Sequence, residues 1–265
     1  MSGAGLFELN YDEVISRISE FIVQIVEKAG SRGVVIGLSG GLDSSVVCAL
    51  SVKALGRDRV KALIMPDSSV TPVRDVEDAK RLAEDFGLEC HFVDIKTLYD
   101  AFSKNVPFYD EEADIANANL RARLRMINLY YYANSRNLLV CGTGDKSELL
   151  LGYFTKYGDG AVDFLPIGDL YKTQVRELAK KLGLPKTIVE KPSSPALLPG
   201  QTAEGELGAS YEEIDRVLYL YMDLGRSIEE IIQETRFSEG KVRAIIRRIH
   251  LNEHKRVLPP IAKII

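Results

Sequence analysis

The run Gly37-Leu38-Ser39-Gly40-Gly41-Leu42-Asp43-Ser44-Ser45 organises the rest of this chain. It follows Val34-Val35-Ile36, a β-branched run typical of a buried strand, and precedes Val46-Val47-Cys48-Ala49-Leu50, an apolar helical run. Adjacent glycines permit positive φ angles and let backbone N–H groups approach a ligand closely, and a helix N-terminus carries partial positive charge. The order of strand, tight loop and helix therefore predicts an anion-binding loop.

Asp43 gives this loop its particular chemistry. A Walker-type phosphate loop has a Lys at the corresponding place before its final Ser or Thr. A carboxylate repels a polyphosphate unless a divalent cation lies between them, so Asp43 indicates Mg²⁺. The alternative is an ordinary capped turn in which Asp or Ser caps the helix. The complete run resembles the pyrophosphate loop of ATP pyrophosphatases, which split ATP into AMP and PPi, and we favour that interpretation.

Composition limits the class of protein. The chain has 265 residues, which is enough for one α/β domain with a full core. Its net charge of -4 does not favour non-specific binding to nucleic acid, so we expect no nucleic-acid partner. Cys48, Cys90 and Cys141 form no Cys-x-x-Cys pair and are expected to be reduced core residues.

No segment of the sequence resembles a membrane or targeting element. Residues 1–6 lack the basic start and apolar core of a signal peptide, and no apolar run approaches the roughly 20 residues of a membrane helix. We therefore expect a cytoplasmic protein with no membrane partner.

Strands and helices alternate along the first half of the chain. Helices are predicted over residues 11–29, 76–86, 99–134 (broken near Pro107) and 172–182, and strands over residues 34–36, 60–65, 91–95 and 138–141. Such alternation predicts a doubly wound parallel sheet with helices on both faces and a ligand at the carboxyl ends of the strands.

A second glycine-rich loop, Gly142-Thr143-Gly144-Asp145-Lys146-Ser147-Glu148, follows the last of these strands. In a doubly wound sheet it would face the first loop across a switch point, although alone it could equally be an ordinary turn before a capped helix. Residues 152–166 lack either periodicity and are rich in glycine, aromatic and charged residues, which indicates a binding loop.

The remaining segments suggest one domain with three parts. We expect an α/β core over about residues 30–185, a mobile active-site lid in the proline-rich segment 191–208, and C-terminal helices over about residues 211–256.

Six motifs together resemble one family. Ammonia-dependent NAD⁺ synthetases carry these motifs in the same order, and the resemblance extends from about residue 10 to residue 260. The motifs are Ser39-Gly-Gly-Leu-Asp-Ser, Ala122-Arg-Leu-Arg-Met, Gly142-Thr-Gly-Asp-Lys-Ser-Glu, Gly152-Tyr-Phe-Thr-Lys-Tyr-Gly-Asp-Gly, Asp169-Leu-Tyr-Lys-Thr-Gln and His254-Lys255-Arg256.

The resemblance implies a fold, a reaction and partners. The fold is a doubly wound parallel five-stranded sheet of the adenine-nucleotide α-hydrolase type. The reaction is amidation of deamido-NAD⁺ (nicotinic acid adenine dinucleotide) with ATP and ammonia through an acyl adenylate, releasing AMP and PPi. The expected partners are these small molecules, Mg²⁺ and a second copy of the chain in a homodimer. A carboxylate is a poor acyl donor, so it needs such activation, and the enzyme must chiefly position groups and neutralise phosphate charge.

The resemblance also implies roles for individual residues. The phosphates of ATP would be held by the loop residues Gly37, Leu38, Ser39, Gly40, Gly41, Leu42, Asp43 and Ser44, and ATP would also contact Thr143, Lys172 and Ser194. Mg²⁺ would be bound by Asp43 and Glu148, and the catalytic residues would be Asp43, Ser39 and Lys172. Deamido-NAD⁺ would be bound by Arg123, Lys156, Asp163, His254 and Lys255, some of them from the partner in a dimer.

Two departures from the family pattern stand out. Many family members have Asn or His where this chain has Asp145, which we expect to lie outside the ligand contacts. At Ala203 the family commonly has an acidic residue, which leaves the contribution of the lid open. Considered singly, Arg123, Lys172 and Glu148 could each be ordinary surface charges, and only their joint spacing favours the site.

Other functions are less consistent with the sequence. The first alternative is another ATP pyrophosphatase, either tRNA-modifying or similar to GMP synthetase, and the second is a non-catalytic nucleotide-binding protein. Thiolating enzymes need paired cysteines, which are absent. Lys241, Arg243, Arg247 and Arg248 lie in a loose helix-turn-helix pattern, but the acidic chain argues against DNA binding.

Overall fold

A computed structural model describes residues 9–194, 197, 200 and 202–264. Its parallel sheet consists of β1 (Val34–Gly37), β2 (Val60–Ile64), β3 (Glu89–Phe92) and β4 (Leu139–Val140), in the order β3-β2-β1-β4. Val34 pairs with Val60 on one side and with Leu139 on the other. Because β1 lies between β2 and β4, the sheet reverses its winding at β1, which confirms the predicted switch point.

The number of strands differs from the expected five. Within the described residues the sheet has four strands, and the place of a fifth is marked by one parallel bridge between Cys141 and Phe164. The N–H of Gly142 donates to the carbonyl oxygen of Phe164 at 2.9 Å. Pro166 follows two residues later and has no N–H to donate, so the ladder does not extend into a strand.

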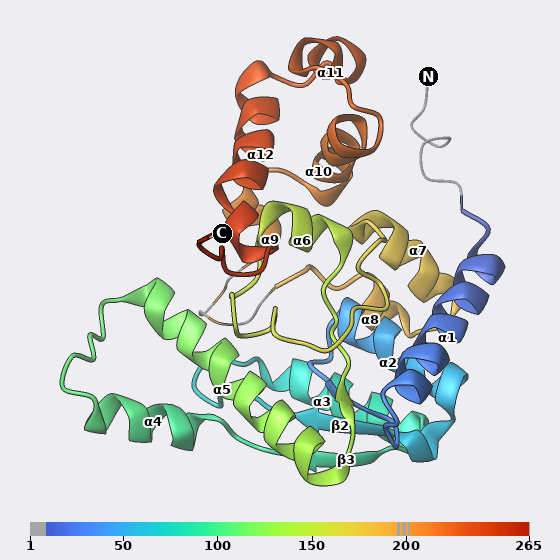
Figure 1. The fold of residues 1–265 in the computed structure, drawn as a ribbon, viewed down its shortest axis with the longest axis vertical. Helices are drawn as coiled ribbons and strands as arrows, with labels where there is room; N and C mark the ends of the chain where they lie inside the picture. Colours follow the sequence, from blue (N-terminus) through green and yellow to red (C-terminus); the bar gives the residue numbers. More distant parts are fainter. Residues whose placement is uncertain (1–8, 195–196, 198–199, 201, 265) are drawn as a thin grey trace.

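Alternate residues of β1 and β2 are buried on opposite faces of the sheet. Val34 and Ile36 belong to the larger apolar cluster, whereas Val35 and Leu63 belong to a second cluster on the other face. The first face is covered by α1 (Tyr11–Lys28), α2 (Leu42–Leu55), α3 (Val73–Asp85), α7 (Lys172–Lys181) and α8 (Lys186–Val189). The opposite face is covered by α5 (Asp114–Arg136) (Figure 1). Helices on both faces explain why β1 is buried throughout most of its length.

Most ends of the predicted helices and strands lie within a few residues of those in the structure. The third strand ends at Phe92 instead of residue 95, because Asp94 turns the chain by accepting hydrogen bonds from the N–H groups of Ser68 and Lys96. The helix predicted over residues 99–134 is two helices, α4 (Lys96–Asn105) and α5, separated by residues 106–113.

The C-terminal helices form a separate layer above α6 (Lys146–Leu151) (Figure 1). They are α9 (Ala203–Leu207), α10 (Tyr211–Leu218), the π-helix Tyr219–Asp223, α11 (Ile228–Thr235) and α12 (Glu239–Leu251). Short 3₁₀-helices lie at Arg57–Arg59 and Glu253–Lys255. A third apolar cluster joins Leu151 and Tyr171 to Ile214 and Val217 of α10. This layer therefore packs directly on the end of α6 and the start of α7.

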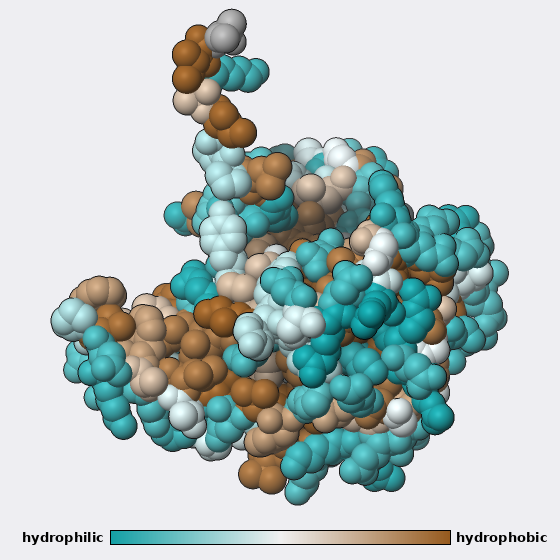
Figure 2. All heavy atoms as spheres, turned by 60° about the horizontal axis from the view of Figure 1, so that its bottom comes forward, coloured by the Kyte–Doolittle hydropathy of each residue, from teal (hydrophilic) through white to brown (hydrophobic). Residues whose placement is uncertain are grey.

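Several large apolar side chains are exposed on α5 and in the loop before it. Ile115, Ile127 and Tyr131 of α5 are 79%, 56% and 78% exposed, and Phe108 in the preceding loop is 82% exposed. Figure 2 shows apolar side chains gathered on the side of the molecule where Figure 1 places α4 and α5. In the part of the chain that the structure describes, no helix is both long and apolar enough to cross a membrane.

Candidate active site

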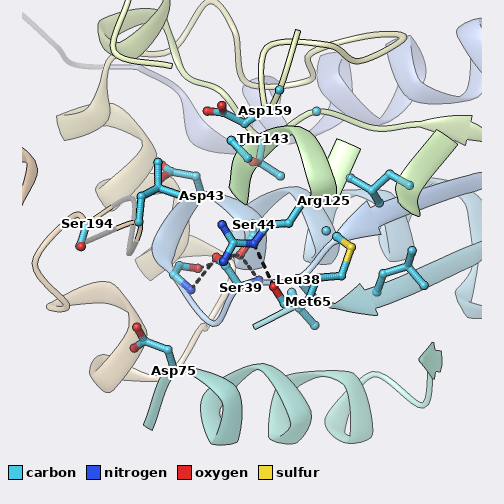
Figure 3. Close-up of a pocket in the computed structure, with 18 of the residues that line it drawn as sticks. Leu38, Ser39, Asp43, Ser44, Met65, Asp75, Arg125, Thr143, Asp159 and Ser194 are labelled. Carbon is cyan, nitrogen blue, oxygen red and sulfur yellow. Dashed lines mark hydrogen bonds between the residues drawn. The ribbon is translucent and has the colours of Figure 1, made fainter. Parts of the chain in front are cut away.

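A pocket of about 280 Å³ opens at the carboxyl ends of the central strands. Gly37 at the end of β1, Ile64 at the end of β2 and Val140 at the end of β4 all line it. Both glycine-rich loops reach this pocket, the first through Ser39 and Asp43 and the second through Thr143 (Figure 3). The predicted meeting of the two loops across the switch point is confirmed.

The first loop leaves the start of α2 available to an anion. Gly41 occupies the N-cap position and has no side chain to accept from the N–H groups of the first turn. The hydroxyls of Ser39 and Ser44 lie 2.9 Å apart, and Ser39 Oγ accepts from the N–H of Gly41 at 3.2 Å. Seven of the loop residues line the pocket, namely Gly37, Leu38, Ser39, Gly41, Leu42, Asp43 and Ser44.

Gly40 has a different role within the loop. Its φ of 75° is in the left-handed region, and an added Cβ would lie 2.1 Å from the carbonyl oxygen of Asp75 on α3. Only glycine permits both this φ and this close approach of two backbones. Gly40 therefore lets the loop pack against the backbone of α3, on the side away from the pocket, and it is not among the residues that line the pocket.

Lys172 lies at the centre of three carboxylates. Its ammonium nitrogen is 2.7 Å from Asp43 Oδ2, 2.9 Å from Asp145 Oδ2 and 2.9 Å from Glu148 Oε1. The side chains of Lys172 and Asp145 are fully buried, whereas those of Asp43 and Glu148 are about one-fifth exposed, at 21% and 22%. The structure thus brings together Asp43, Glu148 and Lys172 from α2, α6 and α7.

Asp145 lies in the same charged cluster as Lys172. Asp145 Oδ1 caps α6 by accepting from the N–H of Glu148 at 2.8 Å, and its other oxygen contacts Lys172. The cap orients this carboxylate toward the buried ammonium, and the expectation that Asp145 makes no contact with a ligand stays a prediction. Its sequence signal was the Asp at the N-cap position, followed three residues later by Glu148.

The cluster has more negative than positive charge. Burial raises the pKa of Glu148 well above its usual value, and the negative charges of Asp145 and Asp43 raise it further. Burial also raises the pKa of Asp145 to about 6. Burial alone would lower the pKa of Lys172, but the three carboxylates raise it well above its usual value. Three carboxyl groups thus surround one ammonium, and burial disfavours the charged forms of Asp145 and Glu148.

A divalent cation fits this cluster. One oxygen from each of Asp43, Asp145 and Glu148 lies within 4.8 Å of the others, and carboxylate oxygens are the ligands that Mg²⁺ prefers. Among the described residues, Asp43 Oδ1 is buried without a hydrogen-bond partner. A buried carboxylate oxygen without a donor is costly, and a cation would satisfy it.

Arg125 and Asp159 are charged residues that line the pocket but were not among the predicted site residues. Arg125 lines the pocket and donates from Nε to the carbonyl oxygen of Met65 at 2.9 Å, and burial lowers its pKa to about 10 (Figure 3). Asp159 also lines the pocket, and burial raises its pKa. Arg125 lies two positions after Arg123, so the two side chains point to different sides of α5, which helical spacing could have shown.

The residues expected to bind deamido-NAD⁺ lie outside the pocket, and four of them form a second group. Arg123 Nη2 donates to the carbonyl oxygen of Lys156 at 3.2 Å, and Lys156 Nζ donates to that of His254 at 2.6 Å. Lys255 Nζ donates to the carbonyl oxygens of Gly152 and Phe154. This group surrounds the loop that the sequence marked as a binding loop.

Asp163 lies apart from both groups. It accepts from the N–H of Val140 at 2.7 Å and from the hydroxyl of Tyr130 at 3.2 Å. The side chain is exposed, and it is not among the residues that line the pocket.

The predicted lid borders the pocket at both of its ends. Lys191, Ser194 and Ala203 line the pocket, and Lys191 Nζ contacts Gly40 O, Asp75 and Asp78 at 2.6 to 2.8 Å. Residues 195, 196, 198, 199 and 201 of this segment lie outside the described residues, so its predicted mobility stays a prediction. Ala203 is buried at the start of α9.

These features define a class of protein. A parallel sheet whose switch point holds a glycine-rich loop, a helix N-terminus and a carboxylate in place of the Walker lysine is typical of nucleotide-binding α/β proteins of the ATP pyrophosphatase kind. The NAD synthase family matches residues 14–259, and the chain belongs to this family.

Three similar proteins illustrate the relationship. The chain is 53% identical to an NH₃-dependent NAD⁺ synthetase from Hyperthermus butylicus, over 96% of this chain and 92% of the relative. Among solved structures, an NMN synthetase from Francisella tularensis is 34% identical with a TM-score of 0.84, over 96% of this chain and 99% of that one. An NH₃-dependent NAD synthetase from Campylobacter jejuni, in complex with the nitrate ion, is 34% identical with a TM-score of 0.81, over 96% of this chain and 100% of that one.

Proposed function

We propose that this chain amidates deamido-NAD⁺ with ammonia and ATP, forming NAD⁺, AMP and PPi. The observation that carries the proposal is the position of Lys172 among Asp43, Asp145 and Glu148, beside the uncapped start of α2. A helix N-terminus and an ammonium suit a polyphosphate, and an excess of carboxylates suits the cation that accompanies it. The relative from Hyperthermus butylicus, at 53% identity, is named for this activity.

The residues of the pocket, and Lys172 and Asp145 buried beside it, would work mainly by charge and position. The N–H groups that begin α2, the hydroxyls of Ser39 and Ser44, and Lys172 would bind the phosphates, where negative charge develops as the bond to pyrophosphate breaks. Asp43 and Glu148, with Asp145, would hold Mg²⁺, which supplies positive charge at the phosphates. Arg125 and Thr143 line the pocket and would orient the rest of the nucleotide.

The reaction has two displacements. A nicotinate carboxylate oxygen forms a bond to the α-phosphorus, and the bond between that phosphorus and pyrophosphate breaks. Ammonia then forms a bond to the acyl carbon, the bond to AMP breaks, and the nitrogen loses a proton. Purified protein with ATP, Mg²⁺, ammonium and deamido-NAD⁺ should therefore release AMP, PPi and NAD⁺, and release of ADP instead would contradict the adenylation.

The nitrogen donor in this proposal is free ammonia, supplied as an ammonium salt, and not glutamine. A glutaminase would need its own nucleophile, base and oxyanion hole, and the buried thiols of Cys48 and Cys141 have pKa values raised by burial, which is opposite to what a nucleophile needs. Turnover with ammonium should exceed turnover with glutamine freed of ammonia by orders of magnitude. Equal turnover with ammonium and with glutamine would contradict the proposal that ammonia is the direct nitrogen donor.

We propose that a homodimer completes the dinucleotide site. Arg123, Lys156 and Lys255 lie outside the pocket, and the exposed apolar side chains Ile127 and Tyr131 of α5 suit burial against a second copy. Sedimentation at working concentration should give a dimer. A fully active monomer would contradict the shared site.

We also propose that segment 191–208 closes over the acyl adenylate and excludes water. Deletion of residues 196–205 should raise the AMP released per NAD⁺ above one, because an exposed adenylate is hydrolysed before ammonia reaches it. Ala203→Asp should change this ratio little. A deletion variant that keeps the ratio at one would identify the segment as a passive linker.

The similarity to the Francisella NMN synthetase, with a TM-score of 0.84, suggests a second candidate substrate, the nicotinate mononucleotide. The two substrates share the reacting carboxylate and differ in the adenylate half, which Arg123, Lys156 and Lys255 would bind. We expect kcat/KM for deamido-NAD⁺ to exceed that for the mononucleotide. The reverse order would assign the chain to mononucleotide amidation.

A further inference from the structure

Asp215 of α10 is a fully buried carboxylate that joins α6 to α7. Its Oδ1 accepts from the hydroxyl of Ser147 at 2.5 Å, and its Oδ2 accepts from the N–H of Thr173 at 2.9 Å. Ser147 Oγ in turn accepts from the N–H of Lys172 at 2.9 Å. One carboxylate from the C-terminal helices thus fixes the first two N–H groups of α7, one directly and one through a serine.

The start of α7 depends on this remote cap. Tyr171 is the N-cap residue, and it forms a capping box with Gln174, whose Oε1 accepts from the N–H of Tyr171 at 2.9 Å. The N–H of Thr173 takes its side-chain acceptor from Asp215, in another helix, and the N–H of Lys172 takes its acceptor from Ser147, which Asp215 holds. A negative charge at this end of α7 is also favoured by the helix dipole.

The same carboxylate fixes both sides of the charged cluster. Ser147 lies between Asp145 and Glu148 in the sequence, and Lys172 is the first residue of α7. Asp223 makes a parallel connection nearer the surface, because it accepts from Tyr171 and from Lys146 Nζ at 3.0 and 3.1 Å. Each carboxylate therefore binds one residue at the start of α6 and one at the start of α7.

A packing role alone does not account for Asp215. Burial raises the pKa of Asp215 to about 7, although hydrogen bonds from Ser147 and Thr173 oppose this shift. Holding a carboxylate here costs free energy that an apolar side chain would not cost. What the carboxylate provides, and an apolar side chain could not, is a fixed relation between the backbones of α6 and α7.

We infer that Asp215 is a positioning residue for the amidation: through Ser147 and the N–H groups of α7, it sets the position of Lys172 relative to Asp145 and Glu148. This inference rests on the proposed function for its reaction but not for its geometry. It gives the C-terminal helices a role in the chemistry, although none of their residues in this network touches the reacting groups.

The test uses the full chain and isosteric variants. Asp215→Asn keeps the shape and one acceptor but loses the charge, and Ser147→Ala removes the link to Lys172. Each should lower kcat by about 10- to 100-fold, because a displacement of about 1 Å can have that effect. KM for deamido-NAD⁺ should stay within about twofold, since the dinucleotide residues lie elsewhere. The double variant should be no slower than the slower single variant, because both substitutions break one network.

Lys172→Met separates positioning from general weakening of the fold. In that background Asp215→Asn should not lower the residual kcat further, because there is no ammonium left to position. A further loss of tenfold or more would overturn the inference, as would a kcat for Asp215→Asn within twofold of the unsubstituted protein. The matched control is Val217→Ala, a buried apolar change on the same helix, which should lower Tm without lowering kcat at temperatures well below Tm.

A second readout does not depend on the reaction. Amide hydrogen exchange at Lys172 and Thr173 should be at least about tenfold faster in Asp215→Asn than in Val217→Ala. Equal exchange in both variants would overturn the inference even if activity fell. An unsubstituted protein that forms no NAD⁺ would instead refute the proposed function, and the exchange comparison would still decide whether Asp215 fixes the start of α7.

Discussion

Lys172→Met should reveal the charge imbalance at the centre of the site. Methionine fills nearly the same space as the lysine stem but leaves Asp43, Asp145 and Glu148 without their shared cation. Removing one partner from a buried ion pair costs about 3–5 kcal/mol. Because Asp43 and Glu148 are about one-fifth exposed, at 21% and 22%, water screens part of this repulsion, and we expect a loss near 3 kcal/mol.

Thermal and urea unfolding in EDTA would measure this loss. For a chain of this size, 1 kcal/mol corresponds to roughly 2–4 °C, so Tm should fall by about 6–12 °C. Lys180→Met is the matched control, because Lys180 is 56% exposed and its contact with Glu177 is on the surface. The control should change the free energy of unfolding by less than about 1 kcal/mol. A Lys172→Met protein within 2 °C of the unsubstituted protein would refute the reasoning, since the carboxylates would then need no counter-charge.

The same variant tests the cation site without any turnover. With the ammonium gone, Mg²⁺ should raise the Tm of Lys172→Met more than that of the unsubstituted protein, because a ligand that binds the folded state stabilises it in proportion to its affinity. Adding Asp145→Asn should reduce this rise. If Mg²⁺ has the same effect on both proteins, the three carboxylates are not a cation site.

Three further predictions follow from single residues. Asp43→Ala should lose most activity while its far-UV circular dichroism stays unchanged, because charge neutralisation by a bound metal contributes several kcal/mol in the transition state; a folded variant with normal turnover would contradict the site. Gly40→Ala should lose roughly 2 kcal/mol more stability than Gly183→Ala in urea titrations, because both glycines have positive φ but only Gly40 would place its Cβ against a backbone oxygen. Hydrogen bonds from Lys61, His91 and Tyr132 lower the pKa of Glu89 to about 2, so this carboxylate stabilises the fold above about pH 4.5 and the contribution is lost as pH falls toward 2. Since its side chain is 47% exposed, the effect should stay below about 1 kcal/mol, and Glu89→Gln should flatten this part of the stability curve.

The sequence could predict the features that depend on local patterns. The apolar runs predicted the boundaries of the first two strands within a residue or two, because a short β-branched run next to glycine is usually a strand. The glycine run predicted the tight loop between β1 and α2, since the need for positive φ at Gly40 is a property of the backbone itself, and anion binding by this loop stays a prediction. Asp43 and Glu148 lie close together because a parallel sheet places the ends of its central strands at one edge, and their binding of Mg²⁺ stays a prediction.

The features that could not be predicted from the sequence depend on tertiary contacts. Asp145 looked like a helix cap, which it is, and nothing local shows that its second oxygen reaches a lysine 27 positions later. Arg125 was not among the predicted site residues, because its burial depends on how α5 lies against the sheet. The fifth strand was expected from the resemblance, and only the placement of Phe164 beside Cys141 shows that pairing there is limited to one bridge.

The charged groups expected to meet the phosphates and those expected to bind the dinucleotide lie in two separate places, so their substitution should affect different kinetic constants. The groups that would meet the phosphates, Asp43, Glu148 and Lys172, lie on elements fixed by one sheet and by the C-terminal helices above it. The cations expected to bind the dinucleotide lie outside the pocket and contact backbone carbonyls of one surface loop. Substitutions in the first set should therefore lower kcat at nearly constant KM, whereas Lys156→Met should raise KM for deamido-NAD⁺ at nearly constant kcat. A Lys156 variant that lost kcat alone would show that the loop closes onto the reacting groups, and the two sets of residues would then form one site.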